Sequence, residues 1–168
     1  HGSVARAGQM IDATFVEVPR QRNTREENAS IKAGEPPKAW EEKPNKLRQK
    51  DVDARWTKKN EGRHYGYKNH INADQGNKLV QSWSVSDAAV HDSQVFDELL
   101  DQTVDAEGKK RPVYADSAYR AKAREEGLAA KGFESQIHEK GTRGHPLSEE
   151  QKASNRVKSK TRVRVEHV

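Results

Sequence analysis

The fold is decided by the stretch Gly8-Gln9-Met10-Ile11-Asp12-Ala13-Thr14-Phe15-Val16-Glu17-Val18. Its alternating pattern predicts a β-strand that carries Ile11, Ala13 and Phe15 on one face and Asp12 on the other. Aspartate is depleted in strands, because its short polar side chain competes for the backbone hydrogen bonds. Two explanations of Asp12 are open at this point. Either the strand is half exposed and Asp12 faces water, or a rigid strand holds a carboxylate for a metal ion or a proton.

The composition is that of a polar chain with a small core. The 168 residues suit one domain, but 32% are hydrophobic, 34% are charged and the mean hydropathy is -1.16. We therefore expect that part of the chain is unpacked or that the chain is a piece of a larger protein. The absence of cysteine excludes disulfides and thiolate metal sites and is compatible with a cytoplasmic compartment. No apolar run reaches the roughly 18 residues of a membrane span, and no signal peptide is visible.

The charges are distributed unevenly around a net value of +5. Residues 19–63 hold thirteen Lys and Arg against eight Asp and Glu, and residues 151–165 hold six Lys and Arg and no acid. Since these segments carry +5 and +6, the rest of the chain carries −6. Basic flanks around an acidic centre suit a protein that grips a polyanion and uses carboxylates in the middle, although a solvated surface of mixed charge would look similar.

The rest of the pattern predicts a long loop and then an alternation of strands and helices. Residues 19–63 contain four prolines and few apolar side chains, so we expect a long basic loop, with a short helix around 45–56 as a weaker alternative. Three leading strands followed by alternating elements predict an α/β fold, with a mixed sheet flanked by helices. Beyond the loop we expect two antiparallel strands joined by a turn at 75–77, a helix from Val95 to Val104 that ends at Gly108, a strand at 111–116, a helix at 118–130, a strand at 133–138 and a basic helix from about 149 to the end.

Two further carboxylates are placed where they could join Asp12. Asp116 ends the strand predicted at 111–116, where open α/β sheets place functional groups, although it would also serve to cap the next helix. Glu166 follows Arg162 by one helical turn, and a surface ion pair between them is the simpler explanation. Three carboxylates in one place would repel one another unless a cation neutralised them, and oxygen ligands alone favour Mg²⁺ or Mn²⁺. Two such ions between carboxylates and a phosphate form the arrangement that displaces phosphodiesters.

Seven short motifs run in one order over almost the whole chain. They are Ile11-Asp12-Ala13-Thr14 and the segments 19–24, 53–56, 64–70, 88–92, 115–119 and 162–168. Through them the chain resembles the catalytic core of DDE-type transposases of bacterial insertion sequences, and most of all the "insertion sequence five" group. The resemblance implies a ribonuclease-H-like fold. In it Asp12, Asp116 and Glu166 would be the catalytic acids, on the first strand, the fourth strand and a following helix, and together would bind two ions of Mg²⁺ or Mn²⁺.

The same resemblance implies an activity and partners. The family cuts at the ends of its own element and joins them to target DNA. The implied partner is therefore double-stranded DNA, with self-association in a full-length complex, in the bacterial cytoplasm and without a membrane.

The resemblance is incomplete near the third acid. Related transposases carry there a tyrosine, two residues, an arginine, three residues, a glutamate, six residues and a lysine. Arg162 and Glu166 keep that spacing, Ser159 stands at the tyrosine position, and the lysine would lie beyond residue 168. We therefore expect one truncated catalytic domain over residues 1–168, a fragment or a degraded copy.

The expected DNA contacts are basic side chains. Lys68 could touch the DNA backbone near the site, although an ordinary solvent-facing lysine fits its strand as well. The other expected contacts lie in the basic run, at Arg156, Lys158, Lys160, Arg162 and Arg164. Three functions remain open: a metal-dependent transposase core, a DNA-binding remnant without catalysis, and a metal-dependent nuclease of the same fold.

Overall fold

The computed structural model describes residues 7–59, 61–104 and 108–168, without the side chains of residues 166 and 167. Contacts within the chain divide it into two compact units. Unit 1 consists of residues up to 14, 69–84 and 91–168, and unit 2 consists of residues 15–68 and 85–90.

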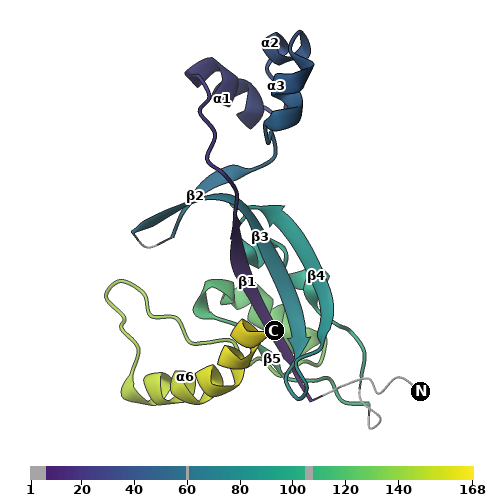
Figure 1. The fold of residues 1–168 in the computed structure, drawn as a ribbon. Helices are drawn as coiled ribbons and strands as arrows, with labels where there is room; N and C mark the ends of the chain where they lie inside the picture. The colour runs from purple at the N-terminus through teal and green to yellow at the C-terminus, as the bar shows by residue number, and fades with distance from the viewer. Residues whose placement is uncertain (1–6, 60, 105–107) are drawn as a thin grey trace, which may run out of the picture. The chain divides into compact units, whose positions relative to one another are not determined.

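In the described residues, five strands form one mixed sheet (Figure 1). The strands are β1 (Gln9–Glu17), β2 (Arg55–Lys59), β3 (Gly62–Asp74), β4 (Val80–Asp87) and β5 (Val113–Tyr114). Their order is β2-β3-β1-β5, and β4 pairs with β3. β1 and β5 run parallel whereas β2 and β3 run antiparallel. The first strand and the turn between β3 and β4 are where the sequence predicts them, and the mixed α/β class is confirmed.

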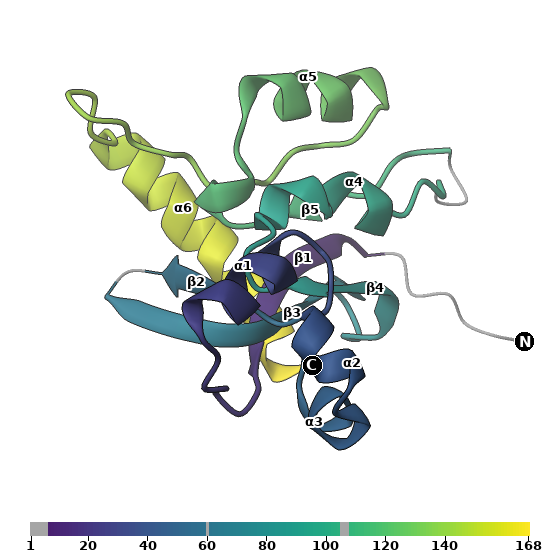
Figure 2. The ribbon, with the colours of Figure 1, turned by 90° about the horizontal axis from the view of Figure 1, so that it is seen from above.

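The described helices of unit 1 follow the strands. They are η1 (Asp92–Gln94), α4 (Phe96–Leu99), η2 (Ser117–Tyr119), α5 (Lys122–Ala130), α6 (Glu149–Arg162) and η3 (Val163–His167). α6 begins as predicted, because the Ser148 hydroxyl accepts from the Gln151 N–H while the Gln151 side chain accepts from the Ser148 N–H. It lies against β5, and its last turn points toward β1 and β5 (Figures 1 and 2). No described helix combines the length and the apolar character that crossing a membrane requires.

The helix expected from Val95 to Val104 is wrong beyond Leu99. The Leu99 carbonyl accepts hydrogen bonds from the Asn72 amide (2.8 Å) and the Ser82 hydroxyl (2.7 Å), so it is not available to a helical N–H. Leu100 has extended backbone angles. The next N–H, of Asp101, then donates to the buried Gln9 side chain (2.8 Å). These polar partners from β1, β3 and β4 end the helix after one turn, although its apolar spacing continues.

Two other predicted elements of unit 1 are shorter than expected. The helix at 118–130 is divided into η2 and α5, and Gly132 ends it with a φ of +75°. The strand at 133–138 is an extended segment that bonds to the edge of β5 without forming a regular strand. Its Gln136 N–H donates to the Val113 carbonyl (2.8 Å), and its His138 N–H donates to the Ala115 carbonyl (3.1 Å).

The loop expected at residues 19–63 is wrong for most of its length. Its described part contains α1 (Arg25–Lys32), α2 (Lys38–Glu41), α3 (Pro44–Gln49) and β2. The strand that carries Asp116 is therefore the fifth along the chain, rather than the fourth.

One carboxylate connects the three short helices of unit 2. Glu27 forms a capping box with Thr24, and its Oε1 accepts from the Trp40 indole and from the Lys46 ammonium (both 2.6 Å). The hydrogen bonds from Lys46, Thr24 and Trp40 lower the pKa of Glu27 to about 2. The partly exposed Glu27 side chain is a polar hub whose hydrogen bonds hold these helices together. The segment therefore lacks the apolar periodicity of a helix, and its sequence looked like a loop.

Gly66 allows β3 to pass close to β1 within unit 2. Its φ is +146°, and a Cβ at this position would run into the carbonyl oxygen of Val16. The Val18 N–H donates to the Tyr65 carbonyl (3.1 Å) beside it. Only glycine fits both the backbone angle and the space.

Candidate active site

In unit 1, Asp12 lies within β1, and Asp116 follows β5, the parallel strand paired with β1. In the register of β1 and β5, Met10 is paired with Tyr114. Each aspartate follows its member of this pair by two residues, and successive residues of a strand alternate in direction. Continuing this register by two residues pairs Asp12 with Asp116 just past the end of β5, where α/β sheets place their functional groups.

The Asp12 carboxylate is held by hydrogen bonds. Its Oδ1 accepts from the N–H of Ala13 (2.9 Å), and its Oδ2 accepts from Nη1 of Arg162 (2.8 Å). The side chains of Asp12 and Arg162 are each 20% exposed. Arg162 thus forms a partly buried pair with Asp12; the ion pair expected between Arg162 and Glu166 involves a side chain outside the described residues.

Asp116 caps the short helix that follows β5. Its Oδ1 accepts from the N–H of Ala118 (2.7 Å), which confirms the capping role read from the sequence. No other hydrogen bond from the described residues reaches this carboxylate, so Oδ2 is available to a ligand. Capping and ligand binding are compatible here, because each uses a different oxygen.

The hydroxyl of Tyr119 lies among carboxylates. The residue is 1% exposed, and no described residue bonds its hydroxyl. Burial raises the pKa of Tyr119, and the charges of Asp92, Asp12 and Asp116 raise it further. The hydroxyl stays protonated and offers a buried donor next to Asp12 and Asp116. The sequence shows Tyr119 only as part of the motif 115–119 and does not indicate where its hydroxyl lies.

Val165, the residue before Glu166, packs in a cluster with residues of β1 and β5 that precede Asp12 and Asp116. Val165 is buried in one apolar cluster with Met10 and Ala73, and Tyr114 packs against that cluster. Met10 and Tyr114 are the paired residues that precede Asp12 and Asp116 by two positions. The backbone of Glu166 is therefore anchored beside the same strand pair. Glu166 lies in η3 and not in the α-helix predicted to reach the chain end, and its side chain is outside the described residues.

α6 is attached to unit 1 through a polar stripe. The stripe consists of Asn155, Lys158, Ser159 and Arg162, at the spacing where an amphipathic helix usually carries apolar residues. Asn155 accepts from the Glu139 N–H (2.8 Å) and donates to the Glu139 carbonyl (3.1 Å). The Lys158 ammonium donates to the Ile137 carbonyl (3.1 Å). The helix is thereby fixed in rotation, which directs Arg162 at Asp12.

His138 is a site residue that the sequence did not reveal. Its Nε2 lies 3.3 Å from the hydroxyl of Ser159, the residue at the tyrosine position of the family signature. Partial burial lowers the pKa of His138; the nearby charges of Arg162 and Lys158 add to this effect, and Asp116 opposes it. The sequence does predict strands at 111–116 and 133–138. If these two segments run parallel, His138 at the end of the second lies beside Asp116 at the end of the first. The parallel direction of residues 133–138 could not be read from periodicity.

The predicted DNA-contact residues fall into two groups. Arg156, Lys160 and Arg164 are exposed, whereas Lys158 is engaged with Ile137 and lies 3.6 Å from Glu139. Lys68 belongs to unit 2, is buried and donates to the Val90 carbonyl (2.6 Å). A buried ammonium bonded to a carbonyl offers little charge to a phosphate, so the exposed side chains of unit 1 are better placed.

Within the described part of the chain, no group of three or more histidine, aspartate or glutamate side chains is close enough to hold a metal ion. The acids that come together there are the pair Asp12 and Asp116.

Comparison with known proteins identifies the family. The family model described as "Transposase DDE domain" matches residues 5–168. A 117-residue stretch, 70% of this chain, is 34% identical to the "Transposase for insertion sequence element IS1106" of Neisseria meningitidis serogroup B. The match spans 39% of that relative's length. No solved structure matches the chain significantly. The chain belongs to the family of transposases with a DDE domain.

Proposed function

We propose that this chain is the catalytic core of a DNA transposase with a ribonuclease-H-like fold, and that Asp12, Asp116 and Glu166 are its three acids. The observation that supports the proposal is the parallel register of β1 and β5, because its continuation by two residues would pair Asp12 with Asp116. The burial of Val165 against the same strands supports Glu166 as the third acid. The proposed reaction is cleavage of a phosphodiester and transfer of the cut strand to target DNA.

The donor set fits a hard divalent cation. Asp12 and Asp116 provide carboxylate oxygens, which Mg²⁺ and Mn²⁺ prefer, and Oδ2 of Asp116 has no hydrogen bond from the described residues. When bound, two such ions supply the Lewis acidity that activates an attacking oxygen and stabilises the leaving one. The residues of the chain hold and orient the ligands. Arg162 offsets the Asp12 charge, and Tyr119 provides a buried proton donor beside the pair.

The DNA would be bound by exposed basic side chains of α6 and η3. Arg156, Lys160 and Arg164 are exposed, while the opposite polar stripe holds the helix in place. Contacts of this kind bind phosphates without reading the sequence, and they weaken steeply as salt releases counterions. Self-association would occur in the complete complex with two element ends.

The test separates chemistry from binding. Asp12→Asn and Asp116→Asn variants of the chain are compared with wild type for nicking of supercoiled plasmid in Mg²⁺ or Mn²⁺. Binding to a labelled duplex is measured in EDTA. Both variants should lose nicking by more than the roughly 100-fold that mutation of outer-shell residues costs, and should keep duplex binding. Asp97→Asn, which changes an exposed carboxylate on α4, is the matched control. Wild-type nicking in Asp12→Asn or Asp116→Asn would contradict the assignment.

A second candidate is DNA binding without catalysis. It is favoured by the contact of Arg162 with Asp12 Oδ2, since a guanidinium already neutralises one metal-binding oxygen. Under this alternative, wild-type protein binds duplex, leaves plasmid intact in both metals and shows no metal-dependent rise in its unfolding midpoint. A metal-binding site would produce such a rise. Nicking without joining of a cut strand would instead identify the nuclease.

A further inference from the structure

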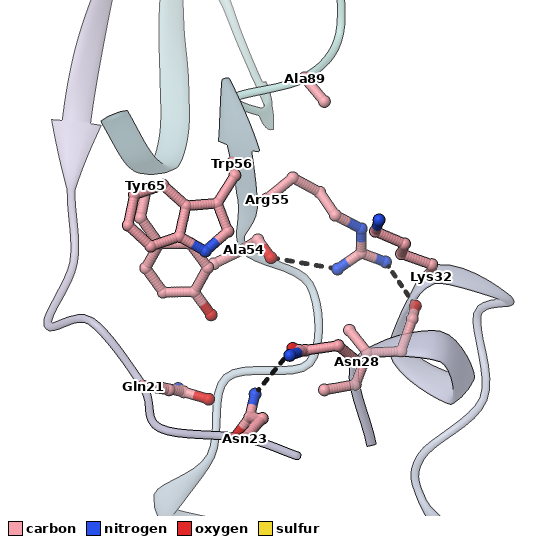
Figure 3. Close-up of a pocket in the computed structure, with 10 residues that line it drawn as sticks. Gln21, Asn23, Asn28, Lys32, Ala54, Arg55, Trp56, Tyr65 and Ala89 are labelled. Atoms are coloured by element: carbon pink, nitrogen blue, oxygen red, sulfur yellow. Dashed lines mark hydrogen bonds between the residues drawn. The ribbon is translucent and has the colours of Figure 1, made fainter. Parts of the chain in front are cut away.

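Unit 2 contains a pocket that the proposed chemistry does not use. Its volume is about 450 Å³, within the roughly 300–1,000 Å³ typical of ligand sites. Ile31 and Ala54, both buried, provide apolar surface, and aromatic rings, carboxamides and a guanidinium surround them (Figure 3). All of its lining residues belong to unit 2, whereas Asp12 and Asp116 belong to unit 1.

The aromatic wall is built from two paired strands. Trp56 on β2 is the register partner of Tyr65 on β3, and their ring centres lie 5.1 Å apart at 37°. Tyr65 is 7% exposed, but Trp56 is 50% exposed. The Arg20 guanidinium lies 5.4 Å from the Trp56 ring centre. Trp56 is thus held by its contacts with Tyr65 and Arg20, and half of its surface is accessible to solvent. An aromatic side chain of this kind can stack against a planar ring.

The polar rim suits the edge of a nucleobase. The carboxamides of Gln21, Asn23 and Asn28 border the pocket, and each such group contains a donor and an acceptor. Oδ1 of Asn23 already accepts from the Lys50 ammonium (2.8 Å), and the Gln21 carboxamide lies against the Asp51 backbone. Asn23 donates to Asn28 (3.4 Å), which links the two groups along the rim (Figure 3). The hydroxyl of Tyr65 has no hydrogen bond from the described residues, and Figure 3 shows it directed into the space between these side chains. Bases present matching donor and acceptor pairs on their exposed edges.

The guanidinium of Arg55 is held rigidly at the side of the pocket. It donates to the carbonyls of Val52 (2.6 Å), Ala54 (3.2 Å) and Ile31 (3.0 Å). Three bonds to backbone fix the charge in place, so a ligand meets a preorganised cation and does not have to order one.

A basic groove adjoins the pocket. Its volume is about 590 Å³, and Arg20, Arg22, Arg48 and Lys50 line it; Gln21 borders both spaces. The acid among its lining residues, Asp51, is occupied by the Tyr67 hydroxyl at 2.7 and 2.8 Å and by two backbone N–H groups. Because the Lys50 ammonium is bonded to the Arg22 carbonyl (2.9 Å) and the Asn23 carboxamide (2.8 Å), Arg20, Arg22 and Arg48 provide most of the positive charge that the groove presents beside the aromatic pocket.

We propose that unit 2 holds an unstacked nucleotide of a DNA strand, with its base against Trp56 and its phosphates in the groove of Arg20, Arg22, Arg48 and Lys50. The choice of DNA rests on the proposed function; the choice of an unstacked base rests on the pocket. A base within a duplex is covered on both faces and cannot enter a pocket of this shape. The ligand is thus a base in a single strand or one turned out of a duplex.

The test measures binding of fluorescein-labelled oligonucleotides to the full chain by anisotropy, in EDTA. The probes are a single strand, the same strand with one abasic position, a matched duplex and a duplex with one mismatch. Trp56→Ala should weaken single-strand binding by about tenfold, as loss of one stacked base does. Trp56→Phe should restore most of the affinity. Trp83→Ala is the matched control, because Trp83 is 69% exposed and lies outside the pocket in unit 1.

Two comparisons decide the outcome. A scan of the abasic position along the strand first identifies the position that weakens wild-type binding most. On the strand with that abasic position, Trp56→Ala should cause no further loss of affinity. Tighter binding of the mismatched than of the matched duplex shows that a base turned out of a duplex also enters, and a preference for the single strand alone assigns the pocket to single strands. Equal affinities of Trp56→Ala and Trp83→Ala, or an equal loss on intact and abasic strands, would overturn the proposal.

The result is independent of catalysis. Asp12→Asn should bind every probe like wild type, since unit 2 is unchanged. If wild-type protein nicks plasmid but its binding does not depend on Trp56, this inference is wrong and the proposed function stands. If binding depends on Trp56 and on the base but plasmid is not nicked, the inference stands and the proposed function is wrong.

Discussion

Arg162 at the end of α6 donates a hydrogen bond from Nη1 to Oδ2 of Asp12 (2.8 Å), across 150 residues of sequence. Both side chains are only 20% exposed. The pair therefore joins the first strand to the last helix and neutralises a carboxylate that the fold holds partly away from water. Its contribution to stability should exceed the few tenths of a kcal/mol that exposed pairs provide.

Replacement of Arg162 should expose this contribution. Arg162→Ala should lower the free energy of unfolding by about 1–3 kcal/mol, because Asp12 keeps its charge and loses its partner. Urea denaturation followed by tryptophan fluorescence measures the loss. In a double-mutant cycle with Asp12→Asn, the two changes should be non-additive by about 1 kcal/mol. Arg156→Ala, an exposed residue of the same helix, should stay within about 0.5 kcal/mol of wild type, and additive effects in the cycle would contradict the pairing.

Asn155 should be the residue that fixes the rotation of α6. Asn155→Ala removes two hydrogen bonds to the Glu139 backbone and leaves its N–H and carbonyl without them, at a cost of about 1–3 kcal/mol. Hydrogen exchange at the Glu139 amide should accelerate at the same time. Ser154→Ala, on the exposed side of the helix, should cause no such loss and no acceleration of exchange; similar losses in both variants would contradict this role of Asn155.

His138 should make the protein less stable in mild acid. Its pKa lies below the ordinary 6.5, so between these two values the unfolded chain binds more protons than the folded one. The free energy of unfolding is therefore unaffected by His138 above about pH 6.5 and falls as the pH drops toward the folded pKa. Urea titrations at several pH values should show this slope in wild type and a smaller one in His138→Gln. His145→Gln, at an exposed turn, should retain the wild-type slope, and an unchanged slope in His138→Gln would refute the assignment.

Gly66 and Gly127 should respond oppositely to alanine. Gly66→Ala places a Cβ against the Val16 carbonyl at a positive φ, so a loss of about 3 kcal/mol or more is expected. Gly127→Ala, inside α5 with open space around it, should gain about 0.5–1 kcal/mol. Thermal unfolding measures both changes. A Gly66→Ala protein as stable as wild type would show that β3 does not pass close to Val16.

The strands and caps that local sequence specifies were predictable. β1 and α6 begin where alternation and the Ser148–Gln151 capping box place them. The pair Thr24 and Glu27 carried the same capping signal in front of α1, but the apolar spacing behind it was too weak to indicate a helix. Short helices held by a polar hub leave no periodicity to read.

Long-range polar contacts were not predictable from one sequence. Nothing local shows that Asn72, Ser82 and Gln9 would end a helix at Leu99 and Asp101. The pairing of Arg162 with Asp12 depends likewise on tertiary structure. Asp12 and Asp116 could be proposed as candidate acids from their residue type and their predicted strands. Tyr119 and His138 become candidate site residues only once the pairing of β1, β5 and residues 133–138 is known.

The span between Asp12 and Arg162 also governs when the site can form. During synthesis Asp12 leaves the ribosome about 150 residues before Arg162 does. Contacts between distant parts of a chain form late, because the loop between them must close first. The pair of Asp12 with Arg162 can therefore form only after the 150 residues that separate them have been made, and the first strand gains this contact late in synthesis.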